Sequence, residues 1–347
     1  IQAAGTIVNM VVSIFLIYIG AGVLFVKADA TGVYMLRLVL VKIYAKRKYP
    51  ALDFHAEPNE GALKQKNAAL LHQVVGIIVN NTDTTVLTIC LGAKSLLEVS
   101  VYGIYMMVVN AVNQLMTSFS NGLTAGFGEV IAKNEEETLK KSYSSYEYMY
   151  FVIMFIVIAC MGVLILPFVG VYTINLTDVQ YVRPVLGILF TVIVFMQNVR
   201  IPGLTIICAA GHYKETRYQA ILEAVINITV SLGLVWKFGM AGVLLGTVCS
   251  YGYRSFEIVF YTSRHLVKGC AKKSMFRIFR NVLVVALLCI VGTYVIPKNM
   301  ASFITWFLYA IGMVAVSVFT IVGVNYVVEP DEFKELVLRV KGILRTK

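Results

Sequence analysis

Three arginines lie inside long apolar stretches of this sequence, at Arg37, Arg200 and Arg254. An ionisable side chain within a membrane-spanning helix is costly, so it normally faces the interior of a helix bundle or a water-filled cavity. The guanidinium group stays charged and presents a planar fork of donors that suits phosphate or pyrophosphate. The three arginines therefore predict a polar cavity that receives an anionic substrate.

Amide and acidic side chains recur at helical spacing in the same kind of apolar stretch. Asn80 and Asp83 share one helix face, and Glu223 lies one turn before Asn227. A further polar stripe runs through the stretch near 97–121. The polar residues that we expect to line the cavity beside the arginines are Asn80, Asn110, Asn113, Gln114 and Gln197.

The same residues also allow a purely structural interpretation. Arg254 could pair with Glu257, and Arg217 could pair with Glu223 near a helix end. Asn and Gln side chains within spans often form hydrogen bonds that hold neighbouring helices together. The sequence leaves both interpretations open.

The composition places these residues in a membrane protein. The chain is 59% hydrophobic and 14% charged, whereas soluble domains are about 45–50% apolar and about 25% charged. The net charge of +11 comes from Lys and Arg in short segments between apolar blocks, which argues against nucleic acid as a partner. The six cysteines form no CxxC pair, and no Walker motif, nucleophile elbow or Cys/His pair is present. We therefore expect no metal, no cofactor and no enzymatic activity.

The apolar blocks are long enough to cross a bilayer, which takes roughly 20 residues as a helix. They predict an all-α membrane protein with about ten transmembrane helices. Pro202 and Gly203 are expected to break or bend one of them. The predicted helices lie near 2–26, 28–45, 67–91, 97–121, 143–169, 180–208, 215–236, 239–262, 275–296 and 301–325.

The connections between these helices alternate between rich and poor in Lys and Arg. By the positive-inside rule, the rich connections are cytoplasmic, and an even number of spans then places both ends of the chain in the cytoplasm. Pro330 and the apolar spacing that follows it predict an amphipathic helix on the membrane surface over 326–347. The connections that are poor in Lys and Arg contain only Lys27, Lys94, Lys237 and Lys298.

Two further patterns carry expectations about packing. Gly242, Gly246 and Gly252 are expected to allow close approach of a neighbouring helix. A cluster of four tyrosines is typical of an aromatic belt at the membrane interface. These residues are Tyr143, Tyr146, Tyr148 and Tyr150.

Two long segments resemble the polysaccharide transporter family, the O-antigen-type flippases of the multidrug/oligosaccharidyl-lipid/polysaccharide exporter superfamily. The first segment, Gly211 to Ser250, contains Glu223 and Asn227 followed by Gly239, Gly242, Gly246 and Thr247. The second, Asn80 to Tyr105, contains an Asn-x-x-Asp turn followed by Gly92 and two tyrosines. The KRKYP segment at Lys46 to Pro50 is similar to the inter-lobe loop of such proteins.

The resemblance implies two helical lobes around a cavity that opens alternately to each side of a bacterial plasma membrane. It implies transport of a polyprenyl-pyrophosphate-linked oligosaccharide from the inner to the outer leaflet, with Arg37, Arg200 and Arg254 as pyrophosphate contacts. Asp83 and Glu223 would bind a coupling ion, H+ or Na+, or pair with the arginines. Relative to the family, the chain lacks about four N-terminal helices. Residues 1–45 would be the last two helices of the first lobe, 46–66 the cytoplasmic linker, 67–325 the second lobe with two additional helices, and 326–347 the tail.

Three other classes compete with this interpretation. A cation-coupled multidrug exporter would have an acidic, aromatic cavity, and the arginines here argue against it. A membrane glycosyltransferase or polymerase would need a long outer loop with catalytic groups, and the predicted outer loops are short. A subunit of a permease with ATP hydrolysis elsewhere would also be compatible with the apparent lack of helices.

Overall fold

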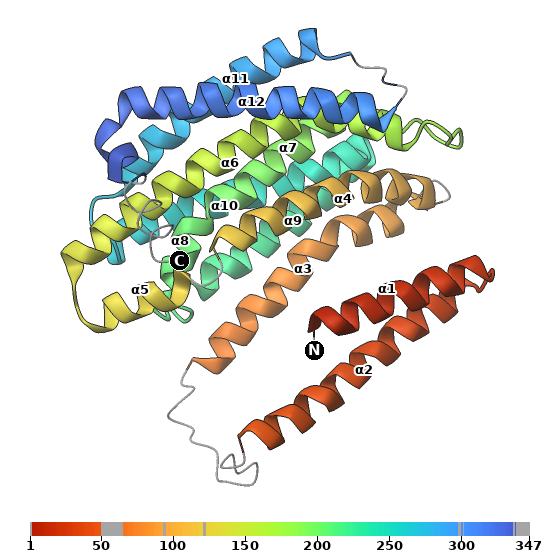
Figure 1. Cartoon of the computed structure of the whole chain (residues 1–347), viewed down its shortest axis with the longest axis horizontal. Coiled ribbons are helices and arrows are strands. Elements are labelled where there is room, and N and C mark those ends of the chain that lie inside the picture. The colour runs from red at the N-terminus through yellow and green to blue at the C-terminus, as the bar shows by residue number, and fades with distance from the viewer. Residues whose placement is uncertain are drawn as a thin grey trace. The chain divides into compact units, whose positions relative to one another are not determined.

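Figure 1 shows the computed structural model of the chain. It describes residues 2–49, 65–92, 95–120, 123–297, 300, 302–335 and 337. Within these residues the regular structure is helical and contains no strand, as predicted. The chain divides into two compact units, Ile1–Lys64 and Gln65–Lys347. Each unit is described separately below.

The first unit is a helical hairpin. Its helices are α1 (Gln2–Tyr18) and α2 (Val23–Lys48). The chain turns between them at Gly20, whose φ of +75° is a backbone conformation that glycine adopts without strain. The predicted first span of 2–26 was therefore too long, because the turn falls within an apolar run that hydropathy alone reads as continuous.

The second unit contains the remaining helices. Residues 50–64 of the predicted linker, and residues 336 and 338–347 of the predicted tail, lie outside the described residues. The helices of this unit are α3 (Lys66–Cys90), α4 (Ser95–Ser120), α5 (Leu123–Ala132), α6 (Glu136–Tyr172), α7 (Pro184–Val199), α8 (Ile201–Ala209), α9 (Arg217–Phe238), α10 (Met240–His265), α11 (Ala271–Val295) and α12 (Phe303–Val328).

Among the described residues, six helical segments are long and apolar enough to cross a membrane, so the chain has the character of a multi-pass membrane protein. The predicted number of about ten is not confirmed by this measure. Both α3 and α10 are long enough to span but fall outside the six, and they carry several of the polar residues discussed above. The six segments are Ser95–Ala132, Glu136–Tyr172, Pro184–Ala209, Arg217–Phe238, Ala271–Val295 and Phe303–Val328.

The helices of the second unit pack side by side. Figure 1 shows α11 and α12 along one edge of this unit and α3 along the opposite edge. Between them, α6 contacts α11, α12 and α7, while α10 contacts α7, α9 and α3. The long helix α6 supplies much of the core. Its tyrosines at 143, 146, 148 and 150 are all buried, so the predicted aromatic belt was wrong; neighbouring helices cover the surface on which the belt was expected.

The predicted break near Pro202 is confirmed. α7 ends at Val199, α8 begins at Ile201, and Arg200 lies at the junction. A proline in the second position of a helix lacks the N–H that would continue the preceding helix, so α8 starts anew. The break therefore fixes the backbone at Arg200, the one residue between Pro184 and Ala209 whose side chain is cationic.

The close approach of α9 to α10 depends on two of the three predicted glycines. A Cβ atom at Gly246 would lie 2.7 Å from the backbone nitrogen of Ser231 and 3.0 Å from the carbonyl oxygen of Asn227. A Cβ atom at Gly242 would lie 2.6 Å from the carbonyl carbon of Leu234. No heavy atom lies within 4 Å of a Cβ placed at Gly252, so this third glycine serves no such contact among the described residues.

We expect Gly246→Ala to lower the free energy of unfolding by about 1–3 kcal/mol, because the added methyl group forces α9 and α10 apart. The control is Gly252→Ala on the same helix, which gains helix propensity without a clash and should be neutral or stabilising. Unfolding of the purified protein in mixed micelles, followed by circular dichroism, measures both. Equal effects of the two substitutions would contradict the assignment of Gly246 as a packing position.

Candidate functional site

Two arginines and two glutamates form a buried cluster at the junction of α7 and α8 with α9 and α10. Nη1 of Arg200 donates to Oε1 of Glu223, and Nε of Arg254 lies 3.6 Å from Oε2 of the same carboxylate. Arg254 also pairs with Glu257, one turn along α10. The side chains of Arg200 and Glu223 are 13% and 10% exposed, and that of Arg254 is 3% exposed. The cluster is therefore neutral overall but retains an opening at Arg200 and Glu223.

An aromatic ring and an amide hold Arg200 in place. Its guanidinium carbon lies 4.5 Å from the ring centroid of Tyr251, a distance at which the ring face attracts the cation. The hydroxyl of Tyr251 donates to Oδ1 of Asn80 at 3.3 Å. Asn80, on α3, was predicted to line a cavity beside the arginines. It lies next to the cluster but contacts it through Tyr251.

Asp83 lies in a second polar network, which joins α3, α9 and α10. Its Oδ1 accepts from the hydroxyl of Thr247 at 2.7 Å, and its Oδ2 accepts from Tyr102 at 3.4 Å. Nδ2 of Asn227 donates to Thr247 at 3.0 Å, while its Oδ1 is buried and accepts no hydrogen bond from the described residues. Asn227 lies one turn from Glu223, so the two networks are adjacent on α9.

The remaining predicted amides belong to α4 and α7. Asn113 donates to Gln197 at 2.9 Å and accepts from Asn198 at the same distance. Asn110 and Gln114 lie on the exposed face of α4. Gln197 and Asn198 lie three and two positions before Arg200, so these hydrogen bonds join α4 to the end of α7 close to the cationic junction.

Arg37 does not belong to this cluster as described. It lies in the first unit, where its Nη2 donates to the hydroxyl of Thr6 at 2.7 Å and its guanidinium carbon is 5.1 Å from the ring centroid of Tyr34. The hydrogen bond to Thr6 joins α1 to α2, while Tyr34 lies one turn before Arg37 on α2. Its predicted role in a shared cavity stays a prediction.

The structural interpretation of the sequence was partly right. The predicted Arg254–Glu257 pair is confirmed. The predicted Arg217–Glu223 pair was wrong, because Glu223 faces Arg200 and Arg254 while Arg217 donates to Tyr218 at 2.8 Å. Only closeness in the chain favoured this pair, since a separation of six residues does not match helical spacing, whereas the tertiary packing supplies cations to Glu223 from two other segments.

A second ion-pair cluster went unnoticed in the sequence, and it is centred on Arg277. This residue of α11 is 1% exposed and pairs with Glu147 of α6 at 3.0 Å and with Glu329 after α12 at 3.0 Å. Its Nη1 also donates to the carbonyl oxygen of Ser144 at 3.1 Å, and the guanidinium lies 5.3 Å from the ring centroid of Tyr148. The signal in the sequence was Glu147 just before an apolar run, together with Arg277 and Arg280 near the start of the predicted helix 275–296.

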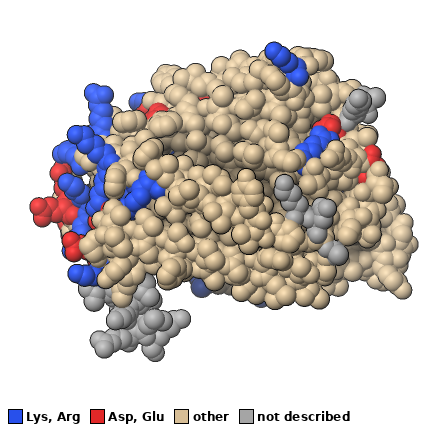
Figure 2. Space-filling model, turned by 90° about the horizontal axis from the view of Figure 1, so that it is seen from above, with Lys and Arg blue, Asp and Glu red and all other residues tan. Residues whose placement is uncertain are grey.

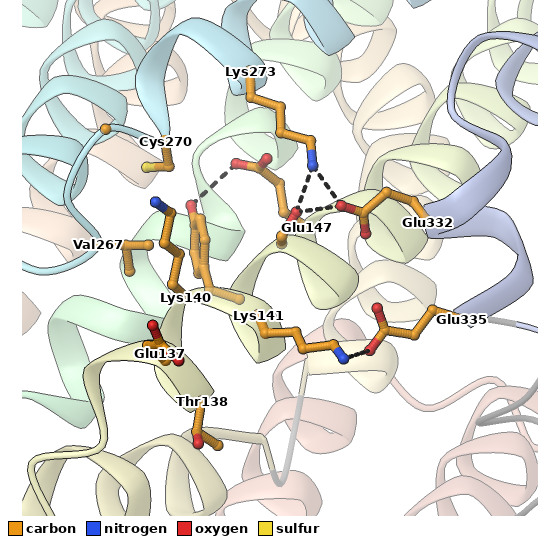
Figure 3. A pocket seen from close by; sticks show the side chains of 13 residues that line it. Glu137, Thr138, Lys140, Lys141, Glu147, Val267, Cys270, Lys273, Glu332 and Glu335 are labelled. Carbon is orange, nitrogen blue, oxygen red and sulfur yellow. Dashed lines mark hydrogen bonds and ion pairs between the residues drawn. The ribbon is translucent and has the colours of Figure 1, made fainter.

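A cavity of about 560 Å³ opens beside this cluster (Figure 3). Figure 3 shows Lys273 directed at Glu332, and Lys141 paired with Glu335. Burial raises the pKa of Glu332, but hydrogen bonds from Lys273 and Ser144 and the charges of Lys273 and Arg277 outweigh it, so the pKa lies below its ordinary value. Glu332 is therefore ionised, and its contacts hold the segment after α12 against α6 and α11.

In the view of Figure 2, basic and acidic side chains gather most densely at the left, and a broad surface without charged side chains separates them from a smaller charged group at the right. The start of α6 lies beside the connection between α10 and α11, since Nζ of Lys268 in that connection is 3.3 Å from the carboxylate of Glu136. This distribution suits helices that cross a bilayer and expose their basic connections on one side.

Among the described residues, no group of three or more His, Cys, Asp or Glu side chains could hold a metal ion. No family model matches this chain, and no curated protein matches its sequence.

Proposed function

We propose that the chain is part of a transporter that moves a polyprenyl-pyrophosphate-linked oligosaccharide from the inner to the outer leaflet of a bacterial plasma membrane. The observation that supports this most is the polar face of α4, a helix within one of the candidate spans. Asn110 and Gln114 are exposed there, together with Thr117 and Ser118. Hydrocarbon is a poor environment for such groups, so this face borders water, a polar substrate or other protein segments.

The chemistry of the site suits the two polar parts of such a substrate. Amide side chains donate and accept hydrogen bonds, which matches the hydroxyl groups of a sugar. Arg200 follows the amides Gln197 and Asn198 in the chain and offers a charged donor fork for a phosphate group. A saccharide on α4 with its pyrophosphate near Arg200 and Arg254 would use both features at once.

Asp83 is the residue that we propose for the coupling ion, H+ or Na+. It is buried in a network of hydroxyl and amide groups, and the unused Oδ1 of Asn227 adds an oxygen on the next turn of the same network. A carboxylate with neighbouring neutral oxygens can bind a hard cation or a proton. The proposed alternation between inward- and outward-open states would make this site accessible to each side in turn.

The proposed arrangement in the membrane includes α3 and α10 as spans, although both fall outside the six apolar segments. With the α1–α2 hairpin as further spans, the chain would have about ten, with both ends cytoplasmic and the basic connections inside. The hairpin would belong to the first of two lobes.

We expect Asn110→Ala combined with Gln114→Ala to reduce transport about 10-fold or more, because two hydrogen-bonding groups are lost from the substrate path, each worth about 1 kcal/mol. The complete gene product is reconstituted in proteoliposomes with a fluorescent polyprenyl-pyrophosphate-linked saccharide. Loss of fluorescence on addition of a membrane-impermeant quencher then measures flipping. Leu115→Ala, at an exposed apolar position beside Gln114, is the matched control and should leave the rate unchanged.

The same liposomes test the competing functions. Accumulation of a cationic dye without saccharide flipping would favour a multidrug exporter and contradict the proposal. Elongation or cleavage of the labelled saccharide would instead indicate a glycosyltransferase or polymerase. Flipping that is unaffected by the α4 double substitution would remove the observation on which the proposal rests.

A further inference from the structure

We propose that residues 329–335, which follow α12, form a latch over a basic site on α6 and α11, and that headgroups of anionic phospholipids bind this site when the latch opens. The partner is therefore an anionic membrane surface. The inference does not depend on the transported substrate, because it concerns only the end of the second unit at which α6 and α11 begin.

The first support is the spacing of three glutamates in the latch. Glu329, Glu332 and Glu335 follow one another at intervals of three residues, and residues 330–335 are helical, so the three carboxylates lie near one side of the latch. Each of them meets a cation of α6 or α11 (Figure 3). Glu329 pairs with Arg277 and Arg280, Glu332 pairs with Lys273 and Arg277, and Glu335 pairs with Lys141.

The second support is a hinge at the start of the latch. Glu329 has a φ of −130° and a ψ of 66°, which ends α12, and Pro330 has no N–H that could continue that helix. Beside the hinge, Arg277 is 1% exposed, whereas Lys273 and Lys141 farther along the latch are 47% and 70% exposed. Exposed ion pairs stabilise little and are screened by salt. The far end of the latch can therefore leave while Glu329 stays in place.

The hold of the latch through apolar contacts is also small. Its ring at Phe333 packs against Tyr326 of α12, with 5.2 Å between the ring centroids. This contact lies on the same side of the hinge as α12, so it does not tie the latch to α6. Charge therefore controls whether the far end of the latch is closed.

The third support is the charge that the latch covers. Five cationic side chains of α6 and α11 line the cavity of about 560 Å³ or pair with the latch. The latch supplies three carboxylates to this group, and α6 supplies two, Glu137 and Glu147. Opening the latch leaves the five cations with the two carboxylates of α6, so the open site is basic. The five cations are Lys140, Lys141, Lys273, Arg277 and Arg280.

An anionic membrane surface is the partner that this charge and position favour. The site lies at basic connections, which the positive-inside rule places beside the cytoplasmic leaflet. That leaflet is rich in anionic lipids, and each Lys or Arg beside it strengthens attachment by about fivefold. After Glu335 the sequence contains four Lys or Arg residues and no Asp or Glu. The same surface therefore attracts the basic site and the sequence that follows the latch, while it repels the glutamates between them.

The test uses a water-soluble carbodiimide, which joins a lysine amine to a carboxylate only where the two are in contact. The purified gene product is placed in nanodiscs of phosphatidylcholine alone or of equimolar phosphatidylcholine and phosphatidylglycerol. Mass spectrometry measures the yields of the latch cross-links Lys141–Glu335 and Lys273–Glu332. We expect these yields to fall about fivefold or more in the anionic discs, because the membrane surface replaces the latch.

The yields are expressed relative to a control pair that the latch does not touch. Lys133 and Glu129 lie one turn apart on α5 with 2.7 Å between the charged atoms, so their cross-link reports only the local reagent concentration. Lys140→Gln removes a cation of the open site that has no ion-pair partner among the described residues. It should preserve the relative yield in neutral discs and lessen its fall in anionic discs. Lys237→Gln, at the end of α9, is the matched variant and should change neither.

A relative yield that is equal in the two kinds of disc overturns the proposal, and this measurement requires no variant. Inorganic phosphate added to neutral discs at constant ionic strength should leave the yield unchanged. An equal fall with phosphate would identify a soluble anion as the ligand and overturn the assignment to the membrane surface. Because the assay contains no saccharide, its outcome is independent of whether the protein flips one.

Discussion

Arg277→Ala is expected to lower the free energy of unfolding by about 3–5 kcal/mol, the largest effect on stability of any substitution considered for this chain. The alanine would leave Glu147 buried without its cation, and Glu147 is 3% exposed. The variant would also remove the contact between α11 and Glu329 after α12. An uncompensated buried carboxylate costs more than the lost attraction itself, because its charge can neither be hydrated nor paired.

Unfolding of the purified protein in mixed micelles, followed by circular dichroism, measures this loss. Arg264→Ala is the matched control, since Arg264 is an exposed arginine near the end of α10 and should change stability by less than about 0.5 kcal/mol. A second comparison separates the charge from the packing: combining Arg277→Ala with Glu147→Gln should recover part of the loss, because the buried charge is gone. A loss below about 1 kcal/mol for Arg277→Ala would mean that water or the membrane surface already solvates this cluster.

Arg200→Gln is expected to reduce saccharide flipping by about 10- to 100-fold, because a hydrogen bond to a charged group is worth about 1.5–3 kcal/mol. The reason is specific to its position. Arg200 is the more exposed arginine of the cluster, its buried Nε has no hydrogen-bond partner among the residues that the structure describes, and it lies at a helix break. Glutamine retains a hydrogen-bonding group but has no charge to offer to a phosphate.

Initial flipping rates in proteoliposomes, compared at equal amounts of folded protein, measure this effect. The double substitution Arg200→Gln with Glu223→Gln removes both charges of the pair and should restore stability, yet flipping should stay low. Recovery of flipping in the double variant would show that Arg200 only neutralises Glu223 and has no contact with the substrate. Arg183→Gln, at the pair with Glu98, tests that loss of an arginine elsewhere does not have the same effect.

The sequence by itself determined the features that depend on local composition and spacing. The length and apolarity of the blocks determined an all-helical membrane protein, and Pro202 with Gly203 determined the break at Arg200. The partner of Arg254 at Glu257 also followed from the sequence, because residues three apart on a helix are neighbours whatever surrounds them. Candidate site residues were recognisable because a charge within an apolar block is costly wherever the chain places it.

The tertiary structure alone decided which residues meet across helices. Arg277 and Glu147 are 130 residues apart in the chain, and Arg200 and Glu223 are 23 apart with the whole of α8 and the start of α9 between them. Whether such groups meet depends on how far each helix is rotated about its own axis and shifted along it relative to its neighbours. Hydropathy along the chain specifies neither the rotation nor the shift. The same holds for Tyr143 and its neighbours, whose burial depends on the helices packed against α6. A membrane-spanning sequence specifies where polar groups must avoid lipid, and only the packing of the helices selects the partner that allows them to do so.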